Sequence, residues 1–181
     1  REEERESSST NGWKRLRARN MEEYLKRIAS SLERAFPPDP DSYFFEKSSA
    51  FIWEPAQNYF SQVSDISTVD ISLLKGMDEE IEQVTFNTDA FIQGKLANNV
   101  LVWGARGMGK STLIKSVVKT ASSKSNNLKI IEVSRDDIGQ VDKLLKLIKN
   151  ITKKFIIFCD DISFDDNETS YKSLKSVLDG G

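Results

Sequence analysis

The chain has 181 residues, and its composition excludes several kinds of functional site. It contains no histidine, which excludes a Ser-His-Asp triad, a histidine general base and histidine ligands to a metal. A single cysteine, Cys159, excludes an internal disulfide and a four-thiolate zinc site. The 26 Lys plus Arg nearly balance the 28 Asp plus Glu, so the net charge of −2 gives no overall field for nucleic acid or an anionic membrane.

The first fifty residues are predicted to form an N-terminal arm. Residues 1–12 are charged and serine-rich, a composition typical of disorder. Residues 13–36 carry apolar side chains at helical spacing, namely Leu16, Tyr24, Leu25, Ile28, Leu32 and Phe36. The prolines that follow end this helix, because proline lacks an amide proton and disfavours a helical residue before it. A basic cluster at residues 14–19 precedes two glutamates, which favours a solvated helix face over a nucleic-acid contact.

The sequence shows neither a predicted membrane span nor a predicted secretory signal. No stretch approaches the roughly 20 apolar residues that a membrane span needs, and the first residues do not resemble a secretory signal. We therefore expect no membrane partner and a cytoplasmic location, with an organelle stroma as the alternative. Because the chain starts at Arg1 and stops at Gly181 just after an amphipathic run, we expect it to be a piece of a longer protein.

The middle of the chain changes from an aperiodic to a helical pattern. Residues 41–70 are rich in aromatic side chains without a period, so we expect an irregular segment that lies across a partner surface, with one short strand at most. From Met77 to Ile92 the apolar residues share one helical face, and Gly94 predicts a left-handed stop at the helix end.

The remaining residues alternate between strand-like and helix-like runs. Short apolar runs at 99–103, 128–133 and 155–159 predict three strands. Amphipathic stripes at 113–121, 141–148 and 171–178 predict the helices between and after them. This alternation predicts an α/β fold in which a parallel sheet is covered by helices on both faces.

The most specific motif is GARGMGKS, which fits G-x-x-x-x-G-K-[ST] between a predicted strand and a predicted helix. Its glycines allow the backbone N–H groups to surround an anion at a helix N-terminus. The lysine reaches the β- and γ-phosphates, and the serine hydroxyl can bind Mg²⁺. The predicted nucleotide contacts are Gly104, Ala105, Arg106, Gly107, Met108, Gly109, Lys110, Ser111 and Thr112.

A second motif, FIIFCDD at residues 155–161, ends a buried strand with two acids. In open α/β sheets, ligands bind at the carboxyl ends of the strands, so these acids are expected beside the phosphate loop. Asp160 is the predicted Mg²⁺-associated acid, and Asp161 is the predicted residue that orients the attacking water. An acid that merely ends a strand or caps a helix is the alternative interpretation of each.

The two motifs together resemble the AAA+ branch of P-loop ATPases. Residues 87–99, 97–117 and 155–181 look like one AAA+-type family of unassigned role, a domain-of-unknown-function ATPase known mainly from bacteria, and the resemblance runs from about Phe51 to Gly181. It implies an AAA+-like P-loop domain at 51–181, after an arm at 1–50, with ATP and Mg²⁺ as cofactors. It also places Leu74, Gly76 and Met77 where AAA+ proteins contact the base, although packing at the start of a helix explains these residues equally well.

The sequence departs from the AAA+ pattern in two respects. Most AAA+ proteins carry Asp-Glu where this chain has Asp160-Asp161, and the shorter side chain should place water less well and slow hydrolysis. The sensor strand, the arginine finger and the helical lid would lie after Gly181, and the missing strand would sit between the first and third strands predicted here. The resemblance therefore implies an incomplete sheet and a chain that binds and hydrolyses nucleotide weakly by itself.

The favoured function is ATP binding with Mg²⁺-dependent hydrolysis, in which Lys110 and Asp161 carry the chemistry. The resemblance implies that the intact protein forms a ring-like homo-oligomer and acts on a macromolecule that the sequence does not identify. Two alternatives stay open: a nucleotide-gated adaptor with little turnover, and a P-loop kinase for a small molecule.

Overall fold

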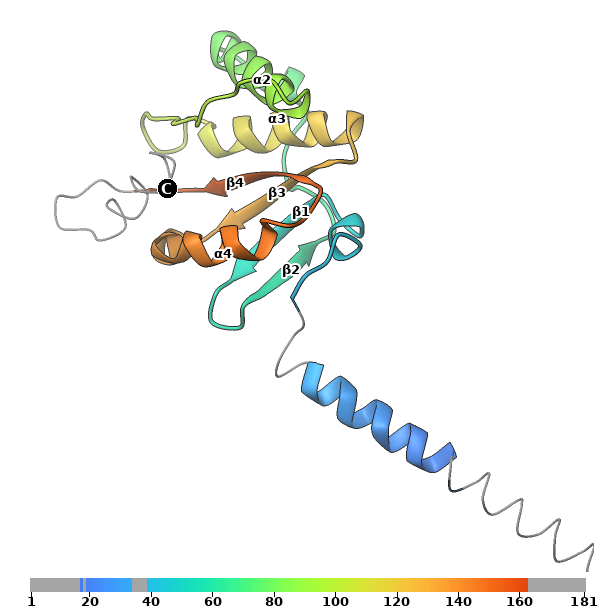
Figure 1. Ribbon diagram of the computed structural model, residues 1–181. Coiled ribbons are helices and arrows are strands. Elements are labelled where there is room, and N and C mark those ends of the chain that lie inside the picture. The colour runs from blue at the N-terminus through green and yellow to red at the C-terminus, as the bar shows by residue number, and fades with distance from the viewer. Residues whose placement is uncertain (1–16, 18, 34–38, 163–181) are drawn as a thin grey trace, which may run out of the picture. The chain divides into compact units, whose positions relative to one another are not determined.

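The computed structural model describes residues 17, 19–33 and 39–162 (Figure 1). The chain divides into two compact units, Arg1–Pro38 and Asp39–Gly181, and each is described here by itself. In the first unit residues 19–33 form a helix, as the apolar spacing predicts. No helix in the described ranges is long and apolar enough to cross a membrane.

The second unit is built on a four-stranded sheet with the order β2-β1-β3-β4 (Figure 1). The strands are β1 (Ala50–Glu54), β2 (Tyr59–Val63), β3 (Leu128–Val133) and β4 (Lys154–Cys159). β1 runs antiparallel to β2 and parallel to β3, and β3 runs parallel to β4. The sheet is therefore mixed and mostly parallel, and it fits an incomplete P-loop fold.

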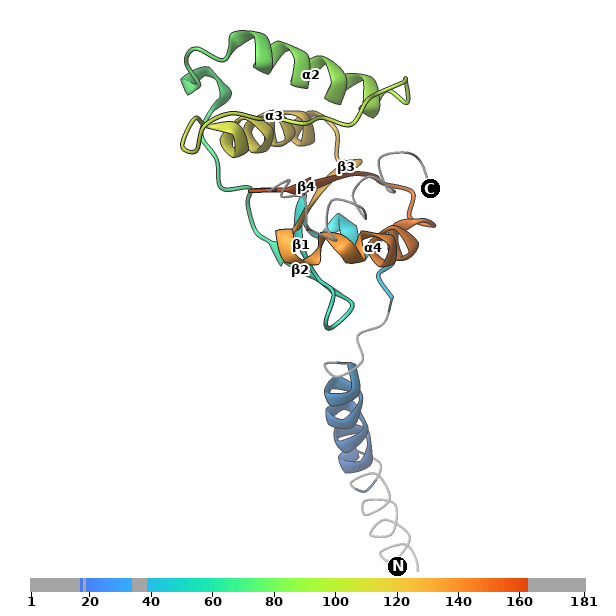
Figure 2. The same cartoon turned by 90° about the vertical axis from the view of Figure 1, so that its left-hand side faces the viewer.

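Helices lie on both faces of this sheet, which confirms the predicted fold class (Figures 1 and 2). On one face lies α3 (Lys110–Lys124), and α2 (Asp78–Ile92) packs on the outer side of α3. On the other face lies α4 (Val141–Ile148). Three short 3-10 helices complete the unit: η1 (Phe44–Glu46), η2 (Ile71–Leu73) and η3 (Arg135–Gln140).

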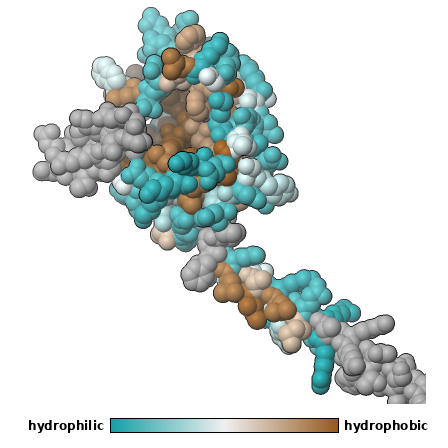
Figure 3. Space-filling model, in the orientation of Figure 1, coloured by the Kyte–Doolittle hydropathy of each residue, from teal (hydrophilic) through white to brown (hydrophobic). Residues whose placement is uncertain are grey.

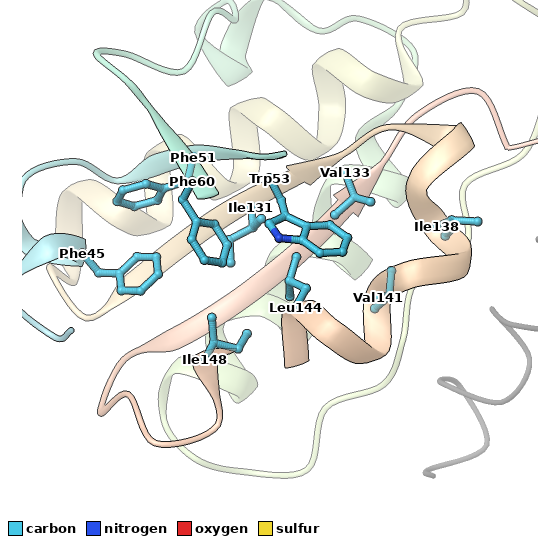
Figure 4. Close-up of a cluster of buried hydrophobic side chains, with 10 residues drawn as sticks. All are labelled: Phe45, Phe51, Trp53, Phe60, Ile131, Val133, Ile138, Val141, Leu144 and Ile148. Carbon is cyan, nitrogen blue, oxygen red and sulfur yellow. The ribbon is translucent and has the colours of Figure 1, made fainter. Parts of the chain in front are cut away.

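The alternation of side chains along the strands divides the core between the two faces of the sheet. In β3, Leu128 and Ile130 face α3, whereas Ile131 and Val133 face α4. The α4 face holds the larger cluster (Figure 4), made of Phe45, Phe51, Trp53, Phe60, Ile131, Val133, Ile138, Val141, Leu144 and Ile148. Its four aromatic residues are at most 1% exposed.

These aromatic residues correct the prediction for residues 41–70. The segment is irregular only in part, because it contains η1 and the β1–β2 hairpin, whose turn places Asn58 at φ 52°. Nor do its rings lie ready for a partner, because most are packed inside this unit. Phe45 contacts the ring of Phe51 edge to face at a centroid distance of 4.9 Å and that of Phe60 at 5.3 Å.

The prediction of a strand at residues 99–103 is wrong. The residues between α2 and α3 contain no strand, and Leu101 and Trp103 are 63% and 86% exposed. A strand is stable only when its backbone pairs with a neighbour, and residues 99–103 pair with none of the four strands of the described sheet.

The other elements lie where the patterns predict them. The helix from Met77 to Ile92 is α2, and Gly94 follows it at φ 73°. The runs at 128–133 and 155–159 are β3 and β4, and the two stripes between residues 113 and 148 are α3 and α4. The helix predicted at 171–178 lies outside the described residues.

Candidate nucleotide-binding site

The loop at residues 104–109 has a backbone that requires glycine at three positions. Gly104, Gly107 and Gly109 have φ values of 143°, 82° and 83°, which L-residues rarely adopt. Gly109 is the N-cap of α3, so the loop leads directly into a helix N-terminus. The loop residues from Gly104 to Met108 are exposed. The helix dipole and the free N–H groups of the first turn make this end of α3 suited to an anion.

The side chain of Lys110 folds back onto the loop that precedes it. Its Nζ donates hydrogen bonds to the carbonyl oxygens of Gly104 at 3.1 Å and Ala105 at 2.8 Å. The ammonium group therefore joins the first turn of α3 to the start of the loop. An ammonium has three donors, so these two bonds leave one for a further acceptor.

The N-terminus of α3 lies toward the carboxyl ends of β3 and β4. Ala121, near the end of the helix, shares a cluster with Leu128 at the start of β3. Lys115, closer to the beginning of the helix, pairs with Glu132 near the end of β3 at 2.9 Å and lies 5.3 Å from the ring centre of Phe158. Since α3 thus runs antiparallel to both strands, its first turn points to the edge where β4 ends.

Asp160 follows β4 at this edge, on the α3 side of the sheet. Phe158 belongs to the cluster beneath α3, and the strand alternation gives Asp160 the same side, whereas Cys159 packs toward α4. Asp160 is partly buried, and its Oδ1 accepts a hydrogen bond from the N–H of Asp161 at 3.0 Å. Asp161 is exposed and has a left-handed backbone with φ 51°. The chain therefore turns at Asp161, so the two acids differ in backbone conformation and in exposure.

Two oxygen donors near this edge are of the kind that Mg²⁺ prefers in proteins. In the described ranges no three acidic or cysteine side chains gather where they could hold a metal ion. Mg²⁺ needs fewer protein ligands, because it keeps several waters and binds the phosphates of its nucleotide. The Ser111 hydroxyl on α3 and the Asp160 carboxylate are hard oxygen donors of the required kind.

The segment between β2 and α2 is fastened along α3 by contacts that no sequence motif predicts. Lys119 pairs with Asp65 at 2.8 Å, and this hydrogen bond lowers the pKa of the Asp65 carboxyl. The hydroxyls of Thr68 and Ser116 lie 2.6 Å apart, and the Ser116 hydroxyl donates to the carbonyl of Val69 at 2.9 Å. These residues are 47 to 54 positions apart in the chain, which explains why local periodicity does not reveal them.

The three predicted base contacts occupy the end of this segment. Leu74 and Met77 pack against the cluster of Val84, Leu113 and Val117, so both have a structural role in the described fold. Met77 Sδ lies 3.5 Å from the position that a Cβ on Gly109 would occupy, which places Met77 beside the loop. Gly76 has a φ of 72° and no neighbour within 4 Å of such a Cβ.

Comparison with known protein families gives one match. The model of the DUF815 family, described as a protein of unknown function, matches residues 46–181, three quarters of the chain. Neither the curated proteins nor the solved structures contain a match to this chain.

Proposed function

We propose that this chain, which belongs to the DUF815 family of AAA-like ATPases of unknown function, binds ATP with Mg²⁺ at residues 104–112 and hydrolyses it. The observation that carries the proposal is the loop itself. Three glycines with positive φ precede the N-terminus of a 15-residue helix, and Lys110 is folded over that loop. A helix N-terminus preceded by such a loop is suited to phosphate groups.

In this proposal the loop amides and Lys110 hold the triphosphate. The Lys110 ammonium would exchange the carbonyl oxygens of Gly104 and Ala105 for phosphate oxygens, which carry a full negative charge and bind it more strongly. Ser111 and Asp160 would hold the magnesium ion, which neutralises charge on the phosphates when bound. Met77 is close enough to the loop to contact the nucleotide.

Asp161 would orient the water that attacks the terminal phosphate. Its exposure leaves the carboxylate accessible to water, and its hydrogen bond to Asp160 fixes its backbone beside the metal-associated acid. The proposal extends to the intact protein, in which a neighbouring copy in a ring would supply an arginine and nucleotide state would act on a macromolecular partner.

The nucleotide-gated adaptor remains the second candidate. It is favoured by the left-handed backbone of Asp161, because φ 51° ends the extended course of β4 before this second acid. In an adaptor, ATP would bind and fix the loop, but the water would not be positioned for attack.

The test is to measure ATP binding by calorimetry and phosphate release for the purified protein and three variants. Lys110→Ala should weaken ATP binding by about 10- to 100-fold, the range for a charge-assisted hydrogen bond. Asp160→Asn should weaken binding only when Mg²⁺ is present. Asp161→Asn should leave binding unchanged and lower the rate of phosphate release.

Lys143→Ala is a matched control, since Lys143 is an exposed lysine on α4, whose side chain bonds Gln140. The control should bind and hydrolyse ATP as the unmodified protein does. Equal ATP binding by Lys110→Ala and Lys143→Ala would rule out the proposed site. Normal binding with no phosphate release above that of Asp161→Asn would instead establish the adaptor.

A further inference from the structure

The helix at residues 19–33 has an exposed apolar face that would be stabilised by packing against another surface. We call Met21, Leu25, Ile28 and Leu32 the heptad face. These side chains are 61%, 57%, 55% and 56% exposed, and hydrophobic residues gather along the visible side of this helix (Figure 3). An isolated helix of this length is only marginally stable in water, because its nucleation costs more than its hydrogen bonds return. Packing of the heptad face against another surface would supply the missing stabilisation.

The spacing of the heptad face is that of a coiled coil. Its residues are separated by four, three and four positions, which places Met21 and Ile28 at d and Leu25 and Leu32 at a. The remaining positions of 19–33 are polar or charged except Tyr24 and Ala29, which flank the apolar stripe at g and e. Such a continuous seam fits the same seam on another helix.

We propose that the heptad face binds the same helix of other copies of this chain, in a parallel, in-register coiled coil of three or four strands. The pairing of g with the following e′ position supports the parallel arrangement. It brings Arg17 opposite Glu22 of a neighbouring copy, and Tyr24 opposite Ala29, so one pair is oppositely charged and the other apolar. This inference does not depend on nucleotide binding.

The identity of the core residues sets the number of strands. Leucine at both a positions together with isoleucine at one of the two d positions, Ile28, favours bundles larger than dimers, and the flexible methionine at the other d position fits either packing. The flanking Tyr24 and Ala29 widen the apolar stripe beyond the a and d positions, and a larger bundle buries such flanks. Residues 19–33 carry three basic and three acidic side chains, so this helix has no net charge to attract it to an anionic membrane.

The first test measures the mass of the purified protein by sedimentation velocity over a range of concentrations, without nucleotide. The unmodified protein should form trimers or tetramers. Ile28→Asp should raise the concentration needed for assembly at least 100-fold, because it places one carboxylate from every strand in the buried Ile28 layer of the bundle. Asn20→Asp adds the same charge at a c position on the outer side of the helix and should assemble normally.

Thermal unfolding of the second unit serves as the folding control, since Ile28 lies outside that unit and should not affect it. Unchanged assembly of Ile28→Asp would overturn the proposal, as would a mass that stays at the monomer or dimer. Binding of a monomeric protein to phosphatidylserine vesicles that Ile28→Asp abolishes would overturn it too, in favour of a membrane.

A second test examines the parallel register with disulfides. In a Cys159→Ser background, Ile28→Cys should cross-link readily under mild oxidation, because equal d positions meet in a parallel bundle. Glu23→Cys, at an outer f position, should cross-link at least tenfold more slowly. Equal rates for the two variants would contradict the register.

Discussion

Asn87 and Asn98 form two hydrogen bonds that hold the chain leading into the loop at residues 104–109. The side-chain amide of Asn87 donates to the carbonyl of Asn98 at 2.7 Å, and its oxygen accepts the N–H of Asn98 at 2.8 Å. Asn87 belongs to α2, whereas Asn98 lies in the segment without secondary structure before Gly104. The two hydrogen bonds therefore tie the position of α2 to that of the loop.

Replacing Asn87 should loosen this segment without unfolding the protein. Asn87→Leu removes both hydrogen bonds with little change in size, and Asn87→Asp removes only the donor. At about 1 kcal/mol for each bond, we expect faster amide hydrogen exchange in residues 95–103 and ATP binding weakened by about 3- to 10-fold for Asn87→Leu, with a smaller effect for Asn87→Asp. Asn99→Leu changes an exposed neighbour and is the control. Exchange that is no faster in Asn87→Leu than in Asn99→Leu would show that these hydrogen bonds do not order the segment.

Gly109 should be sensitive to substitution because of its positive φ and not because an added side chain would clash with a neighbour. Gly109→Ala forces an L-residue to φ 83°, at a cost of about 1–2 kcal/mol, while its Cβ would make an ordinary 3.5 Å contact with Met77. The new residue would relax by changing the loop, so ATP binding should fall by about tenfold or more in calorimetry. Gly94→Ala has the same backbone requirement at φ 73°, away from the loop. It should lower the free energy of unfolding similarly and leave ATP binding intact. If both variants bind ATP equally well, the conformation of Gly109 is not needed for the site.

The apolar run at 99–103 shows where sequence patterns fail. Hydrophobicity reports that a segment favours burial, but it does not report whether a paired neighbour is available. Here the run pairs with none of the four strands of the described sheet, and Leu101 and Trp103 stay exposed. The loop after this run is predictable nonetheless, because glycine and lysine at fixed offsets encode its backbone locally.

The sequence pattern does not predict the β1–β2 hairpin for a different reason, namely the shortness of its strands. Each strand has five residues, so only Phe51 and Trp53 in β1, and Phe60 in β2, show the inward alternation. Two or three positions are too few to establish a period of two. The longer helical stripes of α2 and α3 repeat over 15 residues and were predicted without difficulty.

Lys129 is a buried charge whose removal should not harm the fold. It lies in β3 with 1% exposure, and its Nζ donates to the carbonyl of Ser48 at 2.7 Å. Burial lowers the pKa of Lys129, the nearby Lys153 lowers it further, and Glu46 opposes both. Lys129→Met keeps the aliphatic volume and removes the charge, so we expect a free energy of unfolding at pH 7 that is unchanged or higher by about 1 kcal/mol.

The pH dependence provides the check on this interpretation. Because the pKa of Lys129 is lower in the folded state than in the unfolded state, the folded protein binds this proton less tightly. The burial of the charged ammonium therefore lowers the free energy of unfolding, and this cost is complete at pH values below the folded-state pKa. It disappears as the pH rises toward 10.5, the ordinary value. Urea unfolding should therefore show the advantage of Lys129→Met shrinking between pH 7 and pH 10. A loss of more than about 2 kcal/mol at pH 7 would mean that the bond to Ser48 outweighs the cost of burial.

Cys159 should be an unreactive thiol that reports the charge of Asp160. Burial, together with the charges of Asp160 and Glu132 and against the opposing effect of Arg135, raises its pKa to about 11. The thiolate is the nucleophile, so iodoacetamide should react slowly at pH 8, and the rate should keep rising up to about pH 11. In the urea-unfolded chain the thiol has its ordinary pKa of 9.0, so the alkylation rate should level off just above that pH.

The raised pKa of Cys159 also determines how the free energy of unfolding changes at alkaline pH. The folded state holds the thiol proton more tightly than the unfolded state does. The contribution of the neutral thiol to the free energy of unfolding is therefore complete below pH 9 and is lost as the pH rises toward 11. Cys159→Ser should remove that part of the alkaline loss of stability. Asp160→Asn removes a neighbouring negative charge and should lower the pKa of the thiol, which speeds alkylation at pH 8. Asp142→Asn on α4, where no effect on the Cys159 pKa is expected, is the control. Equal alkylation rates for these two variants would show that the Asp160 carboxylate does not act on the end of β4, and would weaken its assignment to the magnesium site.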